Sequence, residues 1–400
     1  MYEVSLFFYL IVFLFIIRTK NVLLMFLFIA YTLQFWALFF YNDEVVFWPN
    51  AKYTFSKTHP IAIYILEIFL MSNLGFLLST FFVRKQTDFN SDYVFLPNNK
   101  IPNGINLLLM TVVTALIFLK MSIYRFDLIF NGVDLVITAL LSVCFLSAIS
   151  KKRTYQITFV SILLALYIYS QLLTKDRNFI GIFITAIIFY ATFFKINFFR
   201  AISISLMLLM ILIIGIYISI YRAGVEIDAT LFIRYLYYNS WMAVFRPVVD
   251  MLMAENLRLA YLYGRSYLDL GLSFAPSVVY SVFGILKPYV ADNPAQWYAI
   301  KGGGGMHAVG VALKNFGLVG VFLQSFLFSL FTIKLVEITK TKNSLLHYAL
   351  FTCISITYMK SLWYSMLDFV NVITLFVLVV MFIKVIKLLL PTKKVKSRLQ

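Results

Sequence analysis

Long apolar segments recur along the whole 400-residue chain, and they restrict its fold more than any other feature. A helix needs about 20 consecutive apolar residues to cross a bilayer, and many of these segments approach that length. They are continuous and do not alternate between apolar and polar residues, which favours helices over the strands of a β-barrel. Only 13% of the residues are charged, whereas soluble proteins carry about 25%. We therefore predict an all-α polytopic integral membrane protein.

Hydropathy predicts about eleven membrane spans, eight before and three after one long connection. They are expected at residues 4–17, 21–41, 60–82, 104–120, 132–150, 155–173, 178–194, 200–221, 309–333, 345–360 and 369–390. No cleavable signal peptide is expected, because the first segment has neither a basic start nor a small-residue cleavage site. The chain then consists of an N-terminal transmembrane bundle (1–221), a large loop (222–308), and C-terminal helices with a basic tail (309–400).

The distribution of basic residues orients these spans. Lysine and arginine are more frequent in the connections on one side, which also carries the basic C-terminal tail. By the positive-inside rule that side is cytoplasmic, so the N-terminus lies outside and the C-terminus inside. All five tryptophans then fall in outer loops or at the outer ends of spans. Topology and attraction to anionic lipid account for much of the +17 charge, which argues against a nucleic-acid partner.

The long connection, residues 222–308, is expected on the outer side. A connection of this length in a compact membrane domain is usually functional. Residues 229–263 mix apolar and polar residues at helical spacing, which is typical of interfacial helices. Residues 268–286 are apolar but interrupted by Gly271, Pro276 and Gly284. We expect this piece to lie on the surface or re-enter the membrane, with a true span as the alternative.

Basic residues of the large loop are mostly arginine, whereas lysine dominates elsewhere. The loop holds 5 Arg and 2 Lys, and the rest of the chain holds 7 Arg and 20 Lys. Arginine is preferred where a planar fork must grip a phosphate or carboxylate at two points. The alternative is that these arginines pair with acidic residues of the loop or extend towards lipid headgroups. The acidic residues are Glu226, Asp228, Asp250, Glu255, Asp269 and Asp292.

The loop ends in a run of four glycines at the start of the ninth span, in the sequence KGGGGMHAVGVALKNFG at 301–317. A glycine run before a helix N-terminus can form an anion cradle, because backbone N–H groups are free to approach the ligand. We expect the helix to begin near Met306, with His307 in its first turn. Lys314 follows on the same face, and a lysine inside a span is a functional candidate. The alternative is a flexible hinge, a capping role for His307, and a Lys314 that extends outward.

Three stretches resemble bacterial O-antigen polymerases, the Wzy-type enzymes that join oligosaccharide repeat units. They are GGGGMHAVGVALKNFGLVGVF at 302–322, YLYGRSYLDL at 261–270 followed by Pro276, and NPAQWY at 293–298. The number of spans and the single large outer loop in the second half are also similar to that family. The resemblance in motifs covers roughly residues 260–320, and the first 220 residues match only in hydropathy. One departure is Val311, which stands where many relatives carry an acid.

The resemblance implies a GT-C-like fold and a glycosyltransferase of the bacterial inner membrane that works at the periplasmic face. Its donor and acceptor would both be oligosaccharides on undecaprenyl diphosphate, and a chain-length regulator protein is a further candidate partner. Neither a metal nor another cofactor is expected. The two cysteines, Cys144 and Cys353, lie in apolar segments, which also argues against a cysteine-based metal site or disulfide framework.

This reaction assigns roles to residues of the large loop and the ninth span. The attacking hydroxyl must lose a proton, for which His307 is the first candidate base and Glu226, Glu255 and Asp292 are alternatives. The leaving diphosphate needs fixed cations and N–H groups. The candidates for diphosphate binding are Arg222, Arg246, Arg258, Arg265, Lys301, Gly302, Gly303, Gly304, Gly305 and Lys314. The candidates for sugar stacking are Tyr238, Trp241, Trp297 and Tyr298, and interfacial anchoring is their alternative role.

Two other functions remain open at this point. A flippase or other transporter is expected to show two repeated halves and ionisable residues deep in several spans. Here no internal repeat is evident, and charges inside the spans are sparse, with Glu67 and Lys314 as the main examples. An O-antigen ligase would share the lipid diphosphate substrate, and only the phenotype of a deletion separates it from a polymerase.

Overall fold

A computed structural model of the chain is mostly helical. It describes residues 1–47, 51–83, 103–122, 133–150, 153–173, 178–194, isolated positions between 202 and 220, 245–272, 277–286, 306–363 and 367–389. Two of its helices are long and apolar enough to cross a membrane, α3 (Pro60–Thr80) and α16 (Ala308–Lys342), and several shorter apolar helices accompany them. This agrees with a membrane protein of the predicted class.

The helices of the N-terminal half lie close to the expected spans. They are α1 (Tyr2–Arg18), α2 (Val22–Thr32), α3, α4 (Asn103–Ser122), α6 (Val133–Ser150), α7 (Thr154–Leu173) and α8 (Asn178–Phe193). The second span differs, because α2 ends at Thr32 and continues as a 3₁₀ helix, η1 (Leu33–Leu38). The hydroxyl of Thr32 donates to the carbonyl of Phe28 at 2.7 Å. Such side-chain bonding to the preceding turn often bends helices.

A small β-hairpin lies between η1 and α3, so the all-α prediction misses one element. Strands β1 (Glu44–Val46) and β2 (Thr54–Ser56) pair antiparallel, with Val45 opposite Phe55, and a 3₁₀ turn η2 (Ala51–Tyr53) precedes β2. Val45 and Phe55 are both buried. The hairpin is too short to stand alone and is held by packing on the helices.

In the described part of the C-terminal half, three short helices are followed by three long ones. They are α12 (Arg246–Ala254), α13 (Arg265–Leu272), α14 (Ser277–Val282), α16, α17 (Leu345–Trp363) and α18 (Leu367–Leu389). Within the 268–286 piece the structure describes the end of α13 and all of α14, residues 273–276 lie outside the described residues, and Gly284 after α14 has a positive φ of 64°. Helix α16 continues nine residues beyond the expected end at 333 and carries Lys334, Lys340 and Lys342 on that extension.

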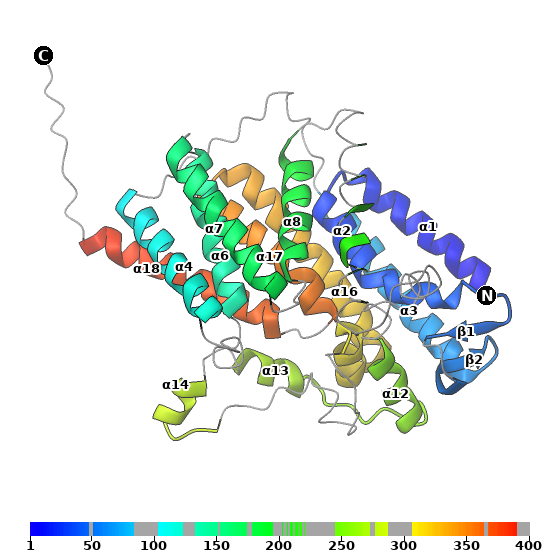
Figure 1. The fold of residues 1–400 in the computed structure, drawn as a ribbon. Coiled ribbons are helices and arrows are strands. Elements are labelled where there is room, and N and C mark those ends of the chain that lie inside the picture. Colours follow the sequence, from blue (N-terminus) through cyan, green and yellow to red (C-terminus); the bar gives the residue numbers. More distant parts are fainter. Residues whose placement is uncertain are drawn as a thin grey trace, which may run out of the picture.

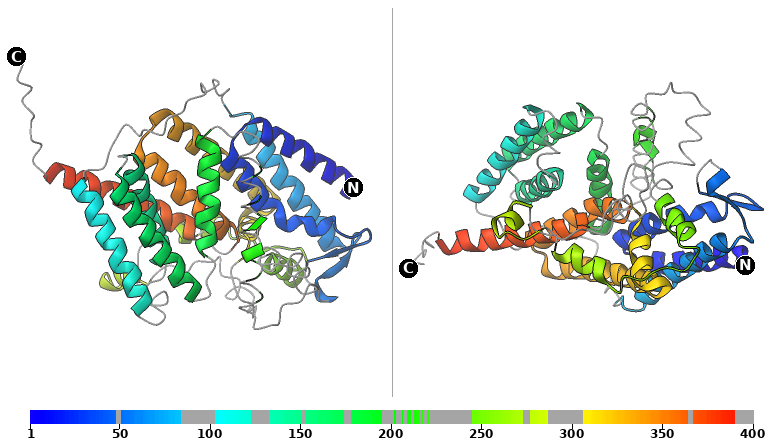
Figure 2. Two further views of the ribbon diagram at one scale, coloured as in Figure 1. Left: turned by 45° about the horizontal axis from the view of Figure 1, so that its top comes forward. Right: turned by 90° about the horizontal axis from the view of Figure 1, so that it is seen from below.

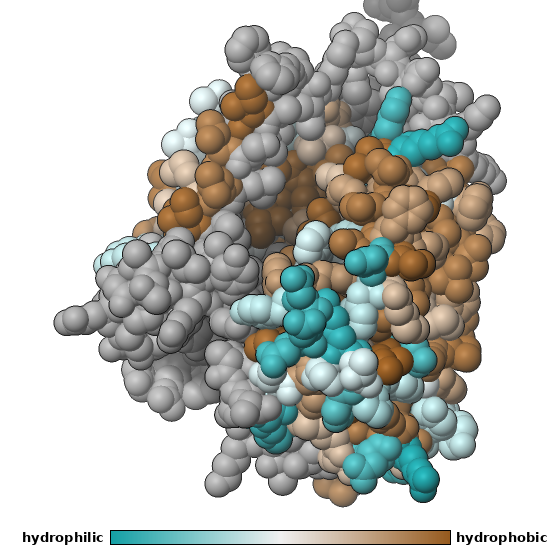
Figure 3. Space-filling model, turned by 90° about the vertical axis from the view of Figure 1, so that its right-hand side faces the viewer, coloured by the Kyte–Doolittle hydropathy of each residue, from teal (hydrophilic) through white to brown (hydrophobic). Residues whose placement is uncertain are grey.

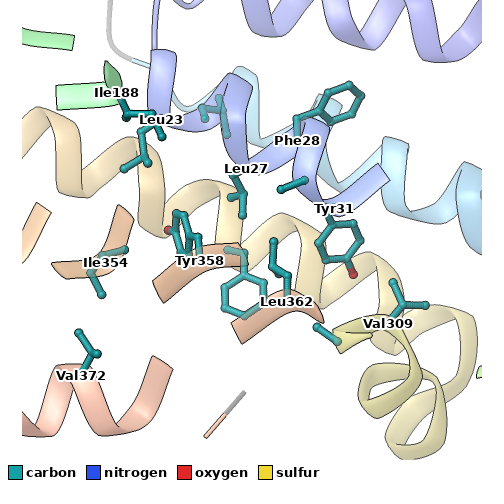
Figure 4. Packing of buried hydrophobic residues seen from close by; sticks show 14 of the residues in the cluster. Leu23, Leu27, Phe28, Tyr31, Ile188, Val309, Ile354, Tyr358, Leu362 and Val372 are labelled. Carbon is teal, nitrogen blue, oxygen red and sulfur yellow. The ribbon is translucent and has the colours of Figure 1, made fainter. Parts of the chain in front are cut away.

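Helix α16 lies in the middle of the helical layer (Figures 1 and 2). It packs against α3 on one side and α17 on the other, with α1 beyond α3 and α6 beyond α17. Buried side chains of α2, α16 and α17 pack together between these three helices (Figure 4). They include Leu27, Tyr31, Tyr358 and Val309. Helices α12, α13 and α14 lie together along the end of the layer where α16 begins (Figure 1).

Surface hydropathy on the side of α1 and the hairpin fits a membrane-embedded layer. Hydrophilic side chains gather towards the end that carries the hairpin, and a hydrophobic region separates them from a smaller hydrophilic group at the opposite end (Figure 3). Exposed apolar side chains of α1, such as Phe7 and Leu14, belong to this side of the molecule. Lipid tails would cover such a band without cost.

Helices α3 and α16 run parallel in close contact, with small residues between them. A side chain at Gly75 would collide with the backbone of Phe322 and with Ser325, and one turn later the hydroxyls of Ser79 and Ser329 meet. The two residues of each pair, Gly75 with Ser325 and Ser79 with Ser329, are 250 positions apart in sequence, so the register between the helices is constant over this turn. Small residues four apart allow close backbone approach where lipid removes the hydrophobic driving force between helices.

Helix α16 is kinked at Phe316 and Gly317, whose backbone angles are not helical. Gly317 adopts φ 60° and ψ −147°, a region open almost only to glycine. A Cβ atom at this position would lie 2.8 Å from the hydroxyl of Tyr261. The NFG sequence therefore marks a break in the helix. The break is at Gly317, which is covered by Tyr261 of a neighbouring loop.

We predict that Gly317→Ala destabilises the protein by about 1–3 kcal/mol, because alanine resists the positive φ and its methyl group displaces Tyr261. The measurement is the thermal unfolding midpoint of detergent-solubilised protein. Gly271→Ala is the matched control, since a Cβ there meets nothing within 4 Å. Equal midpoints for the two variants would contradict the strained kink.

Candidate functional site

The N-terminus of α16 is capped by the side chain of His307, which is fully buried. Its Nδ1 atom accepts a hydrogen bond from the backbone N–H of Val309 at 3.3 Å, and its ring packs against Tyr31 and Phe245. Burial lowers the pKa of His307 to about 3, so the imidazole is neutral at physiological pH. Because the accepting nitrogen is occupied by the cap, this geometry favours the capping role over that of a base.

Segment 255–267 docks onto α16 at its kink. The backbone N–H groups of Leu262 and Tyr263 donate to the carbonyls of Lys314 and Asn315, at 2.9 and 3.2 Å. In a regular helix each of these carbonyls would accept a hydrogen bond from the N–H four residues later, and the kink interrupts this pattern. The two stretches YLYGRSYLDL and ALKNFG, far apart in sequence, are therefore joined by backbone hydrogen bonds.

Asn315 fastens this contact through its side chain. Its Oδ1 accepts from the N–H of Gly264 at 3.0 Å, and its Nδ2 donates to the hydroxyl of Ser266 and to the carbonyl of Val311 at 2.7 Å. Asn315 and Ser266 are both fully buried. A buried amide with this many partners specifies one docking position for the segment.

Lys314 forms an ion pair with Glu255 beside this contact. The two side chains are 9% and 17% exposed, so the pair is largely shielded from water. The second carboxylate oxygen of Glu255 accepts from the N–H of Ala260 at 2.8 Å. Lys314 thus turns inward to the docked segment and does not extend to the surface, and Glu255 is held as its counterion.

Two arginines of the same segment, Arg258 and Arg265, are exposed. Within the described part of the chain, neither guanidinium group has an ion pair or a side-chain hydrogen bond. Arg265 opens helix α13, directly after Gly264. The docked segment therefore carries two available guanidinium groups at the end of the layer where α16 begins.

Arg246 belongs to a different cluster, centred on Asp250 and the hairpin. The hydroxyl of Tyr53 donates to both carboxylate oxygens of Asp250, at 3.1 and 3.2 Å, and Lys52 donates to one of them at 3.0 Å. The Nε atom of Arg246 donates to the Tyr53 hydroxyl at 2.7 Å, and its guanidinium lies over the tyrosine ring. The same Nε atom lies 3.8 Å from the Asp250 carboxylate, so Arg246 pairs with an acidic residue of the loop, which was the alternative expectation. The cluster ties α12 to the hairpin.

We predict that Asp250→Asn costs about 1–3 kcal/mol of stability, because the buried acceptor serves Tyr53, Lys52 and Arg246. Lys52→Ala should cost less than about 1 kcal/mol, since the Lys52 side chain is 60% exposed. Both are measured as shifts of the thermal unfolding midpoint. A Lys52→Ala shift as large as that of Asp250→Asn would show that the cluster is not centred on the carboxylate.

A chain of polar groups behind the docked segment was missed by sequence reasoning. The hydroxyl of Tyr31 donates to Gln324 at 2.9 Å, and the amide of Gln324 donates to the hydroxyl of Tyr267 at 3.2 Å. Tyr267 also stacks on Phe316 at the kink. A glutamine in the middle of an apolar helix was the available signal, because such a side chain needs partners.

The remaining candidates lie outside the described residues. They are Arg222, Glu226, Tyr238, Trp241, Asp292, Trp297, Tyr298, Lys301 and the four glycines Gly302, Gly303, Gly304 and Gly305. Within the described residues, no group of three or more His, Cys, Asp or Glu side chains could hold a metal ion.

Comparison with known proteins adds no further assignment. No protein-family model, curated protein or solved structure matches the chain.

Proposed function

We propose that the chain is an O-antigen polymerase, a glycosyltransferase that joins undecaprenyl-diphosphate-linked oligosaccharide repeat units. In this proposal the chain crosses the bacterial inner membrane about eleven times, and the end where α16 begins faces the periplasm. The observation that carries it is the docking of segment 255–267 onto α16, which unites two motifs of the resemblance. This contact groups the exposed Arg258 and Arg265 with the buried Lys314–Glu255 pair.

The reaction needs a site of this kind. The acceptor hydroxyl attacks the anomeric carbon of the donor chain, and the bond from that carbon to the lipid diphosphate breaks. Negative charge grows on the departing diphosphate, so fixed cations stabilise the transition state more than the ground state. Arginine suits this task because its planar fork can donate two hydrogen bonds to phosphate oxygens.

Lys314 and Glu255 have a supporting part in this scheme. Lys314 neutralises Glu255, so the pair holds the docked segment, and with it the arginines, in a fixed position on α16. A preorganised site of this kind does not need to rearrange as charge develops. Glu255 is engaged by Lys314 and by the N–H of Ala260, which makes it a poor acceptor for a proton.

Deletion of the gene in its own bacterium tests this function. A polymerase mutant attaches a single repeat unit to the lipid core, so the ladder of surface polysaccharide on a gel collapses to one band. Expression of the intact protein from a plasmid should restore the ladder. Loss of every repeat unit from the core would contradict the proposal and favour a ligase or a flippase, and a normal ladder would exclude all three.

A further inference from the structure

Glu67 is a carboxylate in the apolar helix α3, seven residues after its first residue, Pro60. At 1.5 Å per residue this is about 10 Å along the helix axis. Its side chain is half-buried, and within the described residues it has no hydrogen bond or ion pair. Lys120, which is also embedded among the helices, is paired with Asp134.

The register between α3 and α16 places Glu67 at the kink. Gly75 lies against Ser325 and Ser79 against Ser329, a constant offset of 250 between two parallel helices. Continued towards the helix N-termini, the same offset sets Glu67 at about the level of Gly317. A separate contact agrees with this placement, because the space beside Gly317 is filled by the hydroxyl of Tyr261. Tyr64, one turn before Glu67, interacts electrostatically with both Tyr261 and Glu67.

Glu67 therefore lies at the level to which the outer segment 255–267 reaches. Non-helical backbone at this depth of a membrane protein is tolerated only where it is buried in protein or lines a water-filled cavity. Tyr261 is 43% exposed and Glu67 is half-buried, so both keep surface that a ligand can reach. An ionisable group at such a depth carries a large cost and is retained for function.

We propose that Glu67 is the catalytic base of this site, the carboxylate that takes the proton from the attacking sugar hydroxyl. This inference rests on the proposed polymerase function. The acceptor oxygen forms a bond to the anomeric carbon and gives its proton to Glu67. The bond from the anomeric carbon to the diphosphate oxygen breaks, and its electron pair leaves with the diphosphate beside the arginines. Glu67 then releases the proton to water.

The other described candidates fit this role less well. His307 uses its accepting nitrogen as a helix cap in a fully buried position. Glu255 is the counterion of Lys314. Asp250 accepts from Tyr53 and Lys52 in the hairpin cluster. Glu67 has a carboxylate without such a partner among the described residues, and it interacts with Tyr64, which in turn interacts with the motif residue Tyr261.

The test compares Glu67→Gln with the intact protein in lipid nanodiscs, using purified undecaprenyl-diphosphate-linked repeat units as donor and acceptor. We expect kcat to fall about 100-fold or more, the usual contribution of a general base. The KM of the lipid-linked substrate should change less than about threefold, because the arginines that grip the diphosphate remain.

Glu337→Gln is the matched control, since Glu337 is a carboxylate paired with Lys334 near the opposite end of α16. The Glu67→Gln variant should fold at least as well as the intact protein, because it removes a charge from an apolar helix. A Glu67→Gln protein that elongates within about threefold of the control would overturn the assignment of Glu67 alone. An intact protein that folds but forms no polymer would overturn the polymerase function itself.

Discussion

Replacement of Lys314 by methionine is expected to destabilise the protein by about 3–5 kcal/mol, because it removes the cation that pairs with the largely shielded carboxylate of Glu255. The docked segment would separate from α16, and with it the arrangement of Arg258 and Arg265. We therefore expect polymerisation to be lost together with stability. The measurements are the thermal unfolding midpoint in detergent and the ladder of surface polysaccharide in complemented cells.

Two further variants identify the cause of this effect. The double variant Lys314→Met and Glu255→Met removes both charges and should recover most of the lost stability, since both members of the ion pair are then replaced by apolar side chains. Lys334→Met is the matched control, because Lys334 pairs with Glu337 on the same helix but is 43% exposed. It should cost less than about 1 kcal/mol. If Lys314→Met is no more harmful than this control, the buried pair does not hold the docked segment.

Replacement of Arg265 by alanine is expected to reduce glycosyl transfer by about 100-fold or more, the usual cost of removing one group that stabilises a developing anion. Arg258→Ala should have an effect of the same direction. Both side chains are exposed. The free energy of unfolding should therefore change by less than about 0.5 kcal/mol. The measurement is the rate of chain elongation by purified protein at matched protein levels.

Arg265→Lys distinguishes two-point hydrogen bonding to the diphosphate from the effect of positive charge alone. Lysine retains the cation but cannot offer the planar fork, so we expect the variant to stay well below the intact protein. Arg18→Ala is the control, because Arg18 is an exposed arginine at the end of α1 and has no assigned role. Full activity of Arg265→Ala would contradict the placement of the leaving diphosphate at this segment.

The helices could largely be predicted from the sequence, whereas their contacts could not. Hydropathy located α3, α4, α6, α7, α8, α17 and α18 within a few residues, because continuous apolar segments of this length form helices. The change from α2 to the 3₁₀ helix η1 after Thr32 lies within an apolar stretch, so hydropathy does not report it. The hairpin is a short element whose stability comes from tertiary packing, so its sequence alone gave too weak a signal.

The candidate site shows the same limit. The sequence identified Lys314 and Glu255 as functional candidates but not as partners, because 59 residues separate them. It offered both a catalytic and a capping role for His307, and only the position of Nδ1 favours the cap. A glycine after Asn-Phe inside an apolar helix was a sign of the kink, and small residues spaced by four in α3 and α16 were a sign of their close packing.

The central claim is glycosyl transfer between lipid-linked oligosaccharides, and a reconstituted assay tests it most directly. The purified protein in lipid nanodiscs is given undecaprenyl-diphosphate-linked repeat units, with neither nucleotide sugar nor metal added. We predict a ladder of lipid-linked chains in steps of one repeat unit, with one undecaprenyl diphosphate released for each new linkage. A folded protein that yields neither longer chains nor free undecaprenyl diphosphate would contradict the account.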